Sequence, residues 1–353
     1  MRTLIDFAIR TEYSRFKGHR DDLSEIGSQI DWERFRFLEP FLYKNKTSLG
    51  GRPNIDIVIM VKMLVLQHWF GLSDPELEWQ VADRISFRIF LDTTEVVPDF
   101  STVWLFRERL IKSGRFDDLW RELQRQIDEK GYTVKEGSIQ DATFITSDPG
   151  QKRKQKDQEG KCKEEDQELK AIGSKQVQEF DKDLLDISNN IINSQEKPMT
   201  PYEEPTNEGS WAKKGVKSFF GYKGHILIDT KHHLIRNVKT TTASVHDSQV
   251  DLGIEGIPRY SDKGYDGAKT RGYDAAMKKA TRGHKLGIRD ILRNKRISKK
   301  RSHIERCFAV MKRAHKEGHV LVTTVARAGM KFMLNAFVYN MVQLKHLARN
   351  PSN

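Results

Sequence analysis

The hydrophobic pattern of the chain changes its period near Tyr132, and this change constrains the fold more than any other feature. Before it, apolar residues recur every three or four positions, as over residues 57–68, which is the period of an amphipathic helix. After it, residues 137–145 alternate in polarity as a strand does. We therefore expect an N-terminal helical domain over residues 1–130 and an α/β domain over residues 131–350.

Capping residues mark helix boundaries in the first part. Ser73-Asp-Pro75-Glu76 has the pattern of a capping box with proline just inside the helix. Ser101 is the expected N-cap of a helix over residues 102–112. That helix carries Arg107, so the region is compatible with DNA binding of the helix-turn-helix type, and a small bundle with a charged exterior accounts for it equally well.

Strand and turn signals in the second part predict a β-rich core followed by helices. A hairpin is expected from strands at 222–229 and 234–241, and a short strand near 257–261 runs into a glycine-rich turn. The further expected elements are a helix capped by Asp247 or Ser248, a helix over 268–280, a short strand at 286–289, a basic loop at 293–300, a helix over 304–316 and a core helix containing Met330 to Leu344.

Residues 151–209 differ from both parts because they are rich in charge and poor in large apolar side chains. We interpret them as an insertion or linker, helical in part at most. The chain as a whole carries a formal net charge of +12, which favours a polyanionic partner. No apolar run is long enough for a membrane span, and the two cysteines lack the spacing of a zinc site, so a cytoplasmic location is expected.

Three acidic residues stand on separate elements of the second part: Asp141 within a strand, Asp262 at the end of a strand and Glu305 on a helix. A charged residue inside a strand marks either a sheet edge or a site. Glu305 also has a simpler interpretation as the partner of Arg301 in an i,i+4 ion pair on a solvated helix. Together, however, a few carboxylates on rigid elements suit divalent metal ions that act on phosphodiesters.

Six blocks resemble, in order, transposases of the DDE class from insertion sequences, closest to the insertion sequence five group. They lie at residues 98–107, 137–143, 220–225, 242–248, 261–266 and 301–312, the last with Arg301, Glu305 and Lys312 in the spacing of the family's arginine–glutamate–lysine signature. An aromatic residue often precedes that arginine by three positions, and Ser298 stands there instead.

The resemblance implies an RNase H-like catalytic core with a mixed sheet. It also implies that Asp141, Asp262 and Glu305 form the catalytic triad and bind Mg²⁺ or Mn²⁺. DNA-binding roles would fall to Arg301 and Lys312, and with them we place Lys263 and Arg107.

The implied activity is metal-dependent cleavage at the terminal inverted repeats of the element, followed by strand transfer into target DNA. The active form would be a homodimer or a larger assembly on DNA, associated with the nucleoid. Two alternatives stay open: an RNase H-like nuclease that does not join strands, and a DNA-binding relic that has lost catalysis.

Overall fold

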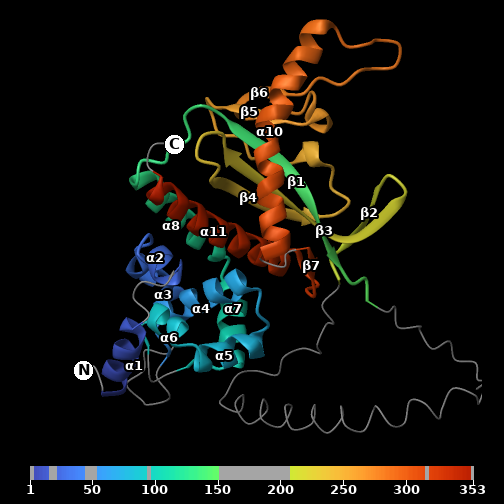
Figure 1. The fold of residues 1–353 in the computed structure, drawn as a ribbon. Coiled ribbons are helices and arrows are strands. Elements are labelled where there is room, and N and C mark those ends of the chain that lie inside the picture. Colours follow the sequence, from blue (N-terminus) through green and yellow to red (C-terminus); the bar gives the residue numbers. More distant parts are fainter. Residues whose placement is uncertain are drawn as a thin grey trace, which may run out of the picture. The chain divides into compact units, whose positions relative to one another are not determined.

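The computed structural model describes residues 4–15, 22–43, 54–93, 97–150, 207–314 and 318–350. Residues 1–149 and 207–353 cluster as one compact unit, to which the helices and strands described below belong (Figure 1). The charged insertion predicted at 151–209 lies outside the described residues up to residue 206.

The N-terminal part is helical, as its hydrophobic period predicts. Ser73 caps α5 by accepting a hydrogen bond from the Glu76 N–H, which confirms it as the N-cap, while the Glu76 side chain accepts a hydrogen bond from Gln80 and not from the backbone of Ser73. The expected cap at Ser101 is wrong: the helix begins two residues earlier than predicted, at Phe100, and Asp99 accepts the Thr102 N–H at 2.6 Å. The elements are α1 (Leu4–Ser14), α2 (Asp22–Gly27), the 3-10 helix η1 (Trp32–Leu38), α3 (Glu39–Leu42), α4 (Ile57–Phe70), α5 (Asp74–Asp83), α6 (Ile85–Leu91), α7 (Phe100–Lys112) and α8 (Phe116–Glu129).

The second part is built on a seven-stranded mixed sheet. Its strands are β1 (Ser138–Ser147), β2 (Ser210–Lys214), β3 (Lys217–Asp229), β4 (Ile235–Thr242), β5 (Pro258–Ser261), β6 (Tyr273–Ala276) and β7 (His319–Val320). β1 pairs antiparallel with β3 and parallel with β5 and β7, while β3 also pairs with β2 and β4. At Asp141, β1 pairs with Ile226 of β3, while its pairing with β5 covers Ser138 and Ile139, so Asp141 lies just beyond the point where β5 ends.

Two long helices, α10 (Ile288–Ala314) and α11 (Val325–Arg349), complete the unit. α11 contacts both parts: its Asn335 lies 3.2 Å from His68 of α4, and its Asn340 side chain bonds the N–H and C=O of Ile235 in β4 at 2.8 and 2.7 Å. Arg327 of α11 adds two bonds of 2.9 Å to Glu108 of α7. The helical part and the sheet therefore share the core that α11 fills.

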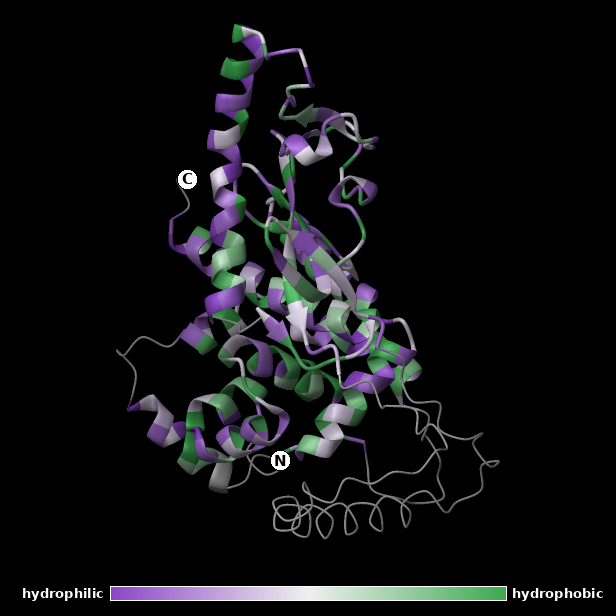
Figure 2. Ribbon diagram, turned by 90° about the vertical axis from the view of Figure 1, so that its right-hand side faces the viewer, coloured by the Kyte–Doolittle hydropathy of each residue, from purple (hydrophilic) through white to green (hydrophobic). Residues whose placement is uncertain are grey.

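α10 packs on β1 and β5 and is largely hydrophilic, with a few hydrophobic residues at its projecting end (Figure 2). The helix predicted over 304–316 is the second half of α10, which is described up to Ala314, and its Ile304 and Met311 are buried. The helix begins at Ile288, so the strand predicted at 286–289 and the basic loop predicted at 293–300 are both wrong. Lysine and arginine are good helix formers, and this half of α10 keeps its helix while much of its surface stays exposed.

Two further expectations differ from the structure. Residues 268–280 hold the strand β6, which extends the sheet in parallel with β5, and not a helix. The segment after residue 246 forms only the 3-10 turn η2 (Asp247–Gln249), with His246 as its cap.

No single helix among the described residues is long and apolar enough to cross a bilayer. The pair α4 and α5 meets that test only when taken together, and it bends by 103° at the break between them. Most residues of α4 are buried in the core.

Candidate active site

The register of two parallel strands brings Asp141 and Asp262 together. Ile139 of β1 pairs with Tyr260 of β5. Asp141 and Asp262 each follow these partners by two residues, so they occupy equivalent positions on the same side of neighbouring strands. The charge of Asp262 is close enough to raise the pKa of Asp141.

Asp141 is held on both carboxylate oxygens. Arg301 of α10 donates to Oδ2 at 2.7 Å, and the backbone N–H of Ala142 donates to Oδ1 at 2.9 Å. The side chains of the ion pair are 20% and 16% exposed. Burial raises the pKa of Asp141 above its usual value, although Arg301 opposes this shift. The carboxylate is therefore poorly solvated and depends on a nearby cation for its charge.

Asp262 lies directly after β5 and caps the 3-10 turn η3 (Lys263–Tyr265). Its Oδ1 accepts the backbone N–H of Gly264 at 2.8 Å, which fixes the orientation of the carboxylate. Lys263 is exposed on this turn, next to the candidate site. The prediction that Asp262 stands at the C-terminal end of a strand is confirmed.

Glu305 follows Arg301 by four residues on α10, about 6 Å along the helix axis. Its side chain is exposed and has no hydrogen bond or ion pair with the residues that the structure describes. Among the described residues, no group of three or more His, Cys, Asp or Glu side chains is arranged to hold a metal ion. The structure thus assembles Asp141, Asp262 and Arg301, while Glu305 stands apart on the same helix as Arg301.

Two of the other residues expected to bind DNA occupy different places. Arg107 donates to both carboxylate oxygens of Asp74, at 2.9 and 2.7 Å, and also to Gln67, so it braces α7 against α5 and α4. Burial alone would raise the pKa of Asp74, but Arg107 outweighs it and the pKa lies below its usual value. Lys312 is exposed near the end of α10, seven residues after Glu305.

The structure adds residues that the sequence analysis did not place in the site. Lys223 of β3 lies 3.0 Å from the Oδ1 atom of Asp247, which was expected to serve as a helix cap. Tyr265 is buried, and its hydroxyl has no hydrogen-bond partner by geometry among the described side chains. Burial, followed by the charges of Asp247, Asp141 and Asp262, raises its pKa. The only sequence signal for Lys223 and Asp247 was their presence in two of the six blocks.

The donor set suits a hard divalent cation. Mg²⁺ binds carboxylate oxygens, keeps several waters and is often held by one or two carboxylates together with substrate phosphates. Asp141 and Asp262 supply two carboxylates close to each other. The residues therefore fit Mg²⁺ or Mn²⁺, provided that the Arg301 contact to Asp141 gives way.

Comparison with known families gives two matches. A model described as a transposase domain matches residues 11–109, and one described as a transposase DDE domain matches residues 191–341. The second match contains Asp262 and Glu305, whereas Asp141 lies outside both. No solved structure matches the chain. Between them the two models cover more than half of the sequence, and the chain belongs to the DDE transposases, with a helical N-terminal region and a mixed-sheet, RNase H-like catalytic core.

Proposed function

We propose that this transposase binds the terminal inverted repeats of its element, cuts the DNA there and joins the freed 3′ ends to target DNA. The observation that carries the proposal is the β1–β5 register, which brings Asp141 of β1 close to Asp262 at the end of β5. Glu305 is carried by the helix α10, which packs across these same two strands.

In this proposal Asp141, Asp262 and Glu305 hold Mg²⁺ or Mn²⁺. When bound, such an ion activates a water or a 3′-hydroxyl and stabilises the leaving oxygen of a phosphodiester. The Gly264 N–H keeps the Asp262 carboxylate in a fixed orientation, which is the preorganisation that such a site requires. Glu305 joins the two aspartates by a change of side-chain orientation, for which its exposed position on α10 leaves room.

The cations around the site have the complementary task of binding phosphates. Lys263 and Lys312 are exposed on either side of the acidic residues and would contact the DNA backbone. Arg301 would exchange its bond to Asp141 for a phosphate when DNA and metal are bound. Arg107 already has both oxygens of Asp74 as partners, so its contribution would be to the stability of the helical region.

The helical region over residues 1–130 would recognise the transposon ends and provide contacts between protomers on DNA. The basic composition of the chain supports DNA binding of any sequence, because phosphate contacts give affinity without sequence information.

The test is a cleavage and joining assay on a duplex that carries the flanking inverted repeats, with Mg²⁺ and with target plasmid. Asp262→Asn and Glu305→Gln should each abolish cleavage and joining while DNA binding persists. Asp290→Asn is the matched control, because Asp290 is the other acidic residue of α10 and lies at its distant end. Its products should equal those of the unmodified protein.

The alternatives give different results in the same assay. Cleavage without joined products would support the nuclease, and binding without cleavage would support the relic. Products that survive in Asp262→Asn or Glu305→Gln would refute the proposed site.

A further inference from the structure

The helix α10 carries ten Lys and Arg residues against two acidic ones, Asp290 and Glu305. Four of the ten have contacts within the protein. Arg301 bonds Asp141, Arg293 donates to the carbonyl of Ala276 at 2.6 Å, and Lys300 donates to the hydroxyl of Tyr260 at 2.9 Å. Lys312 also has an interaction inside the described structure.

The other six cations form what we call the outer face of α10. Each of these six side chains is exposed and has no hydrogen bond or ion pair with any described residue. They are Arg289, Lys295, Arg296, Lys299, Arg306 and Arg313.

Four members of the outer face lie almost in line. Lys295, Lys299, Arg306 and Arg313 follow one another by four, seven and seven residues, which are spacings that return to the same side of a helix. The row is about 27 Å long at 1.5 Å per residue, the length of about eight base pairs of duplex DNA. Glu305 lies within the same span of α10, about a quarter of a helical turn around from the row. The row itself is on the side opposite the buried residues Ile304 and Met311.

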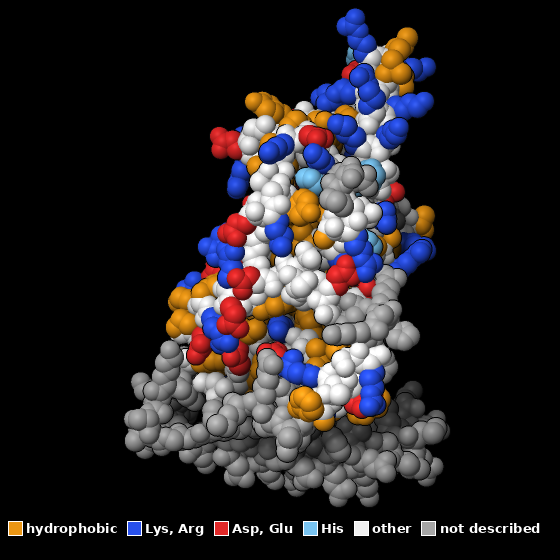
Figure 3. Space-filling view, turned by 60° about the vertical axis from the view of Figure 1, so that its left-hand side comes forward, with side chains coloured by type: hydrophobic (Ala, Val, Ile, Leu, Met, Phe, Trp, Pro, Cys, Tyr) orange, Lys and Arg blue, Asp and Glu red, His pale blue; other side chains and the backbone are white. Residues whose placement is uncertain are grey.

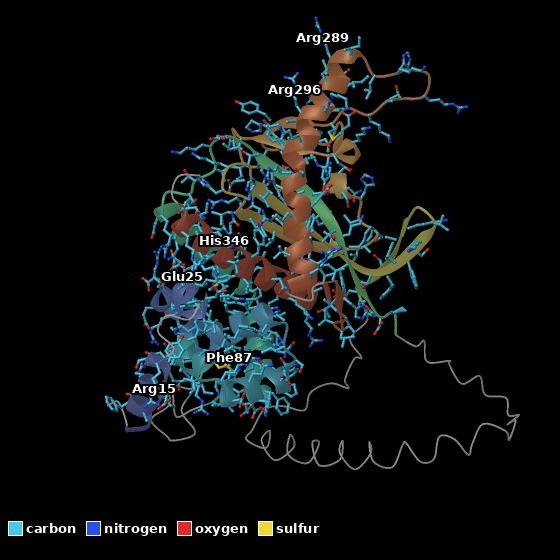
Figure 4. The ribbon with its side chains drawn as sticks, in the orientation of Figure 1. Arg15, Glu25, Phe87, Arg289, Arg296 and His346 are labelled. Carbon is cyan, nitrogen blue, oxygen red and sulfur yellow. The ribbon has the colours of Figure 1, made fainter. Side chains whose placement is uncertain are left out.

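The remaining two members, Arg289 and Arg296, are seven residues apart and share a second side of the helix, about a quarter of a turn from the row. Figure 4 labels Arg289 and Arg296 on the projecting end of α10, with their side chains directed away from the rest of the unit. Figure 3 shows Lys and Arg side chains gathered around this same end of the molecule, with few acidic side chains among them.

The projecting end also exposes Ile288, Ile291 and Leu292, at 78%, 54% and 52%. An exposed apolar cluster can indicate a protein partner, including a second copy of this chain. Two outer faces brought together would, however, set six cations against six, with Asp290 as the nearest acidic residue of the same helix to offset them. Like charges opposed in this way disfavour association, whereas the same face complements a polyanion.

We propose that the outer face of α10 binds the sugar-phosphate backbone of duplex DNA along the span of the helix that also carries Arg301 and Glu305. The proposal rests on the proposed function for the nature of the DNA. It assigns the phosphate contacts of this helix chiefly to cations that have no partner in the protein, and not to Arg301, whose guanidinium already binds Asp141.

The experiment measures the affinity of the full chain for a repeat-bearing duplex over a range of salt concentrations, with a chelator present so that no chemistry occurs. The variant is Lys295→Gln/Lys299→Gln/Arg306→Gln. Each lost phosphate contact should reduce the slope of log affinity against log salt by about 0.9, so the slope should fall by about 2.7. Between about 50 mM and about 200 mM salt, the unmodified protein should lose about 40-fold more affinity than the variant.

The matched control is Lys130→Gln/Lys135→Gln/Lys239→Gln, which removes the same charge from exposed lysines that are not on α10. Its slope should stay near that of the unmodified protein, and Lys295→Arg/Lys299→Arg should keep the full slope because it keeps the charge. Equal losses of slope in the two triple variants would show a general effect of net charge and overturn the proposal. A change in sedimentation coefficient with an unchanged slope would also overturn it, in favour of a second copy as the partner.

The readout separates this inference from the proposed function. A chain that binds with the expected slope difference but never cleaves would refute the proposed function and support the outer face. A chain that cleaves and joins DNA but shows no slope difference would support the proposed function and refute the role of the outer face.

Discussion

Substitution of Arg301 by glutamine should expose a competition between an ion pair and a metal ion for Asp141. The Arg301–Asp141 bond is short, at 2.7 Å, and both side chains are largely buried. A hydrogen bond between charged groups contributes about 1.5–3 kcal/mol, so we expect Arg301→Gln to lower the free energy of unfolding by about 2 kcal/mol without metal. With an unfolding entropy of about 0.7 kcal/mol per kelvin for 353 residues, the midpoint should fall by about 3 °C.

Addition of Mn²⁺ should offset this loss of stability. In the unmodified protein the ion must displace Arg301 from Asp141, whereas in the variant the carboxylate is already available. A cost of about 2 kcal/mol corresponds to a factor of about 30 in affinity, so the variant should bind Mn²⁺ about 30-fold more tightly. Because a ligand of the folded state stabilises it by RT ln(1 + [L]/Kd), the variant should gain more from Mn²⁺ and the gap in midpoint should close.

The assays are thermal unfolding over a Mn²⁺ series and direct Mn²⁺ binding by electron paramagnetic resonance. Arg282→Gln is the control, because Arg282 is exposed before α10 and has no ion pair among the described residues. It should change neither stability nor Mn²⁺ binding. If Arg301→Gln loses no stability without metal, or binds Mn²⁺ no better than the unmodified protein, the competition does not exist.

Three further predictions concern the scaffold. Arg107→Gln should lower the free energy of unfolding by about 2–3 kcal/mol in urea titrations, because it leaves the half-buried Asp74 without its two-bond partner. Burial lowers the pKa of His225 to about 4 in the folded protein. As the pH falls, His225 is therefore protonated in the unfolded chain before it is protonated in the folded protein. Stability should decrease by about 2 kcal/mol from about pH 7 to about pH 5, and less in His225→Gln. Gly224→Ala should destabilise the protein by about 1–3 kcal/mol, because a Cβ there would lie 2.4 Å from a Phe332 ring atom. Gly329→Ala, where the nearest atom is 3.6 Å away, should be neutral or stabilising in the same thermal scan.

The hydrophobic period of the sequence was sufficient to predict the helices and strands whose apolar face is buried. α4, β1, β3, β4 and α11 all have such faces, and each was predicted as the right type of element. The bounds of α4, β1 and β4 were close to those observed, whereas β3 begins five residues earlier than predicted and α11 extends five residues beyond the predicted stripe at each end. The hydrophobic period was not sufficient for the first half of α10, whose Ile288 and Ile291 are exposed and so do not form a buried stripe. β6 is four residues long and its pairing with β5 depends on a neighbour that local sequence does not reveal.

The candidate site could also be predicted only in part from the sequence. The positions of Asp141 and Asp262 on strands could be predicted from alternation and turn signals, but their adjacency depends on the β1–β5 register. The pairing of Lys223 with Asp247 joins a strand to a distant turn, and the capping pattern alone suggested another role for the aspartate. Local sequence describes elements, whereas contacts between them are a property of the assembled sheet.

The position of α11 has a consequence for how the protein is made. α4 and β4 precede α11 in the chain by many residues, yet both depend on it for buried contacts. His68 of α4 lies against Asn335, and the backbone of Ile235 in β4 bonds Asn340. During synthesis the N-terminal helices and the hairpin must therefore wait, with apolar surface exposed, until α11 has left the ribosome. A message truncated before residue 325 would yield aggregation-prone chains and not a separately folded DNA-binding fragment. Production of transposase is in this way tied to complete translation, since neither half has a finished core of its own.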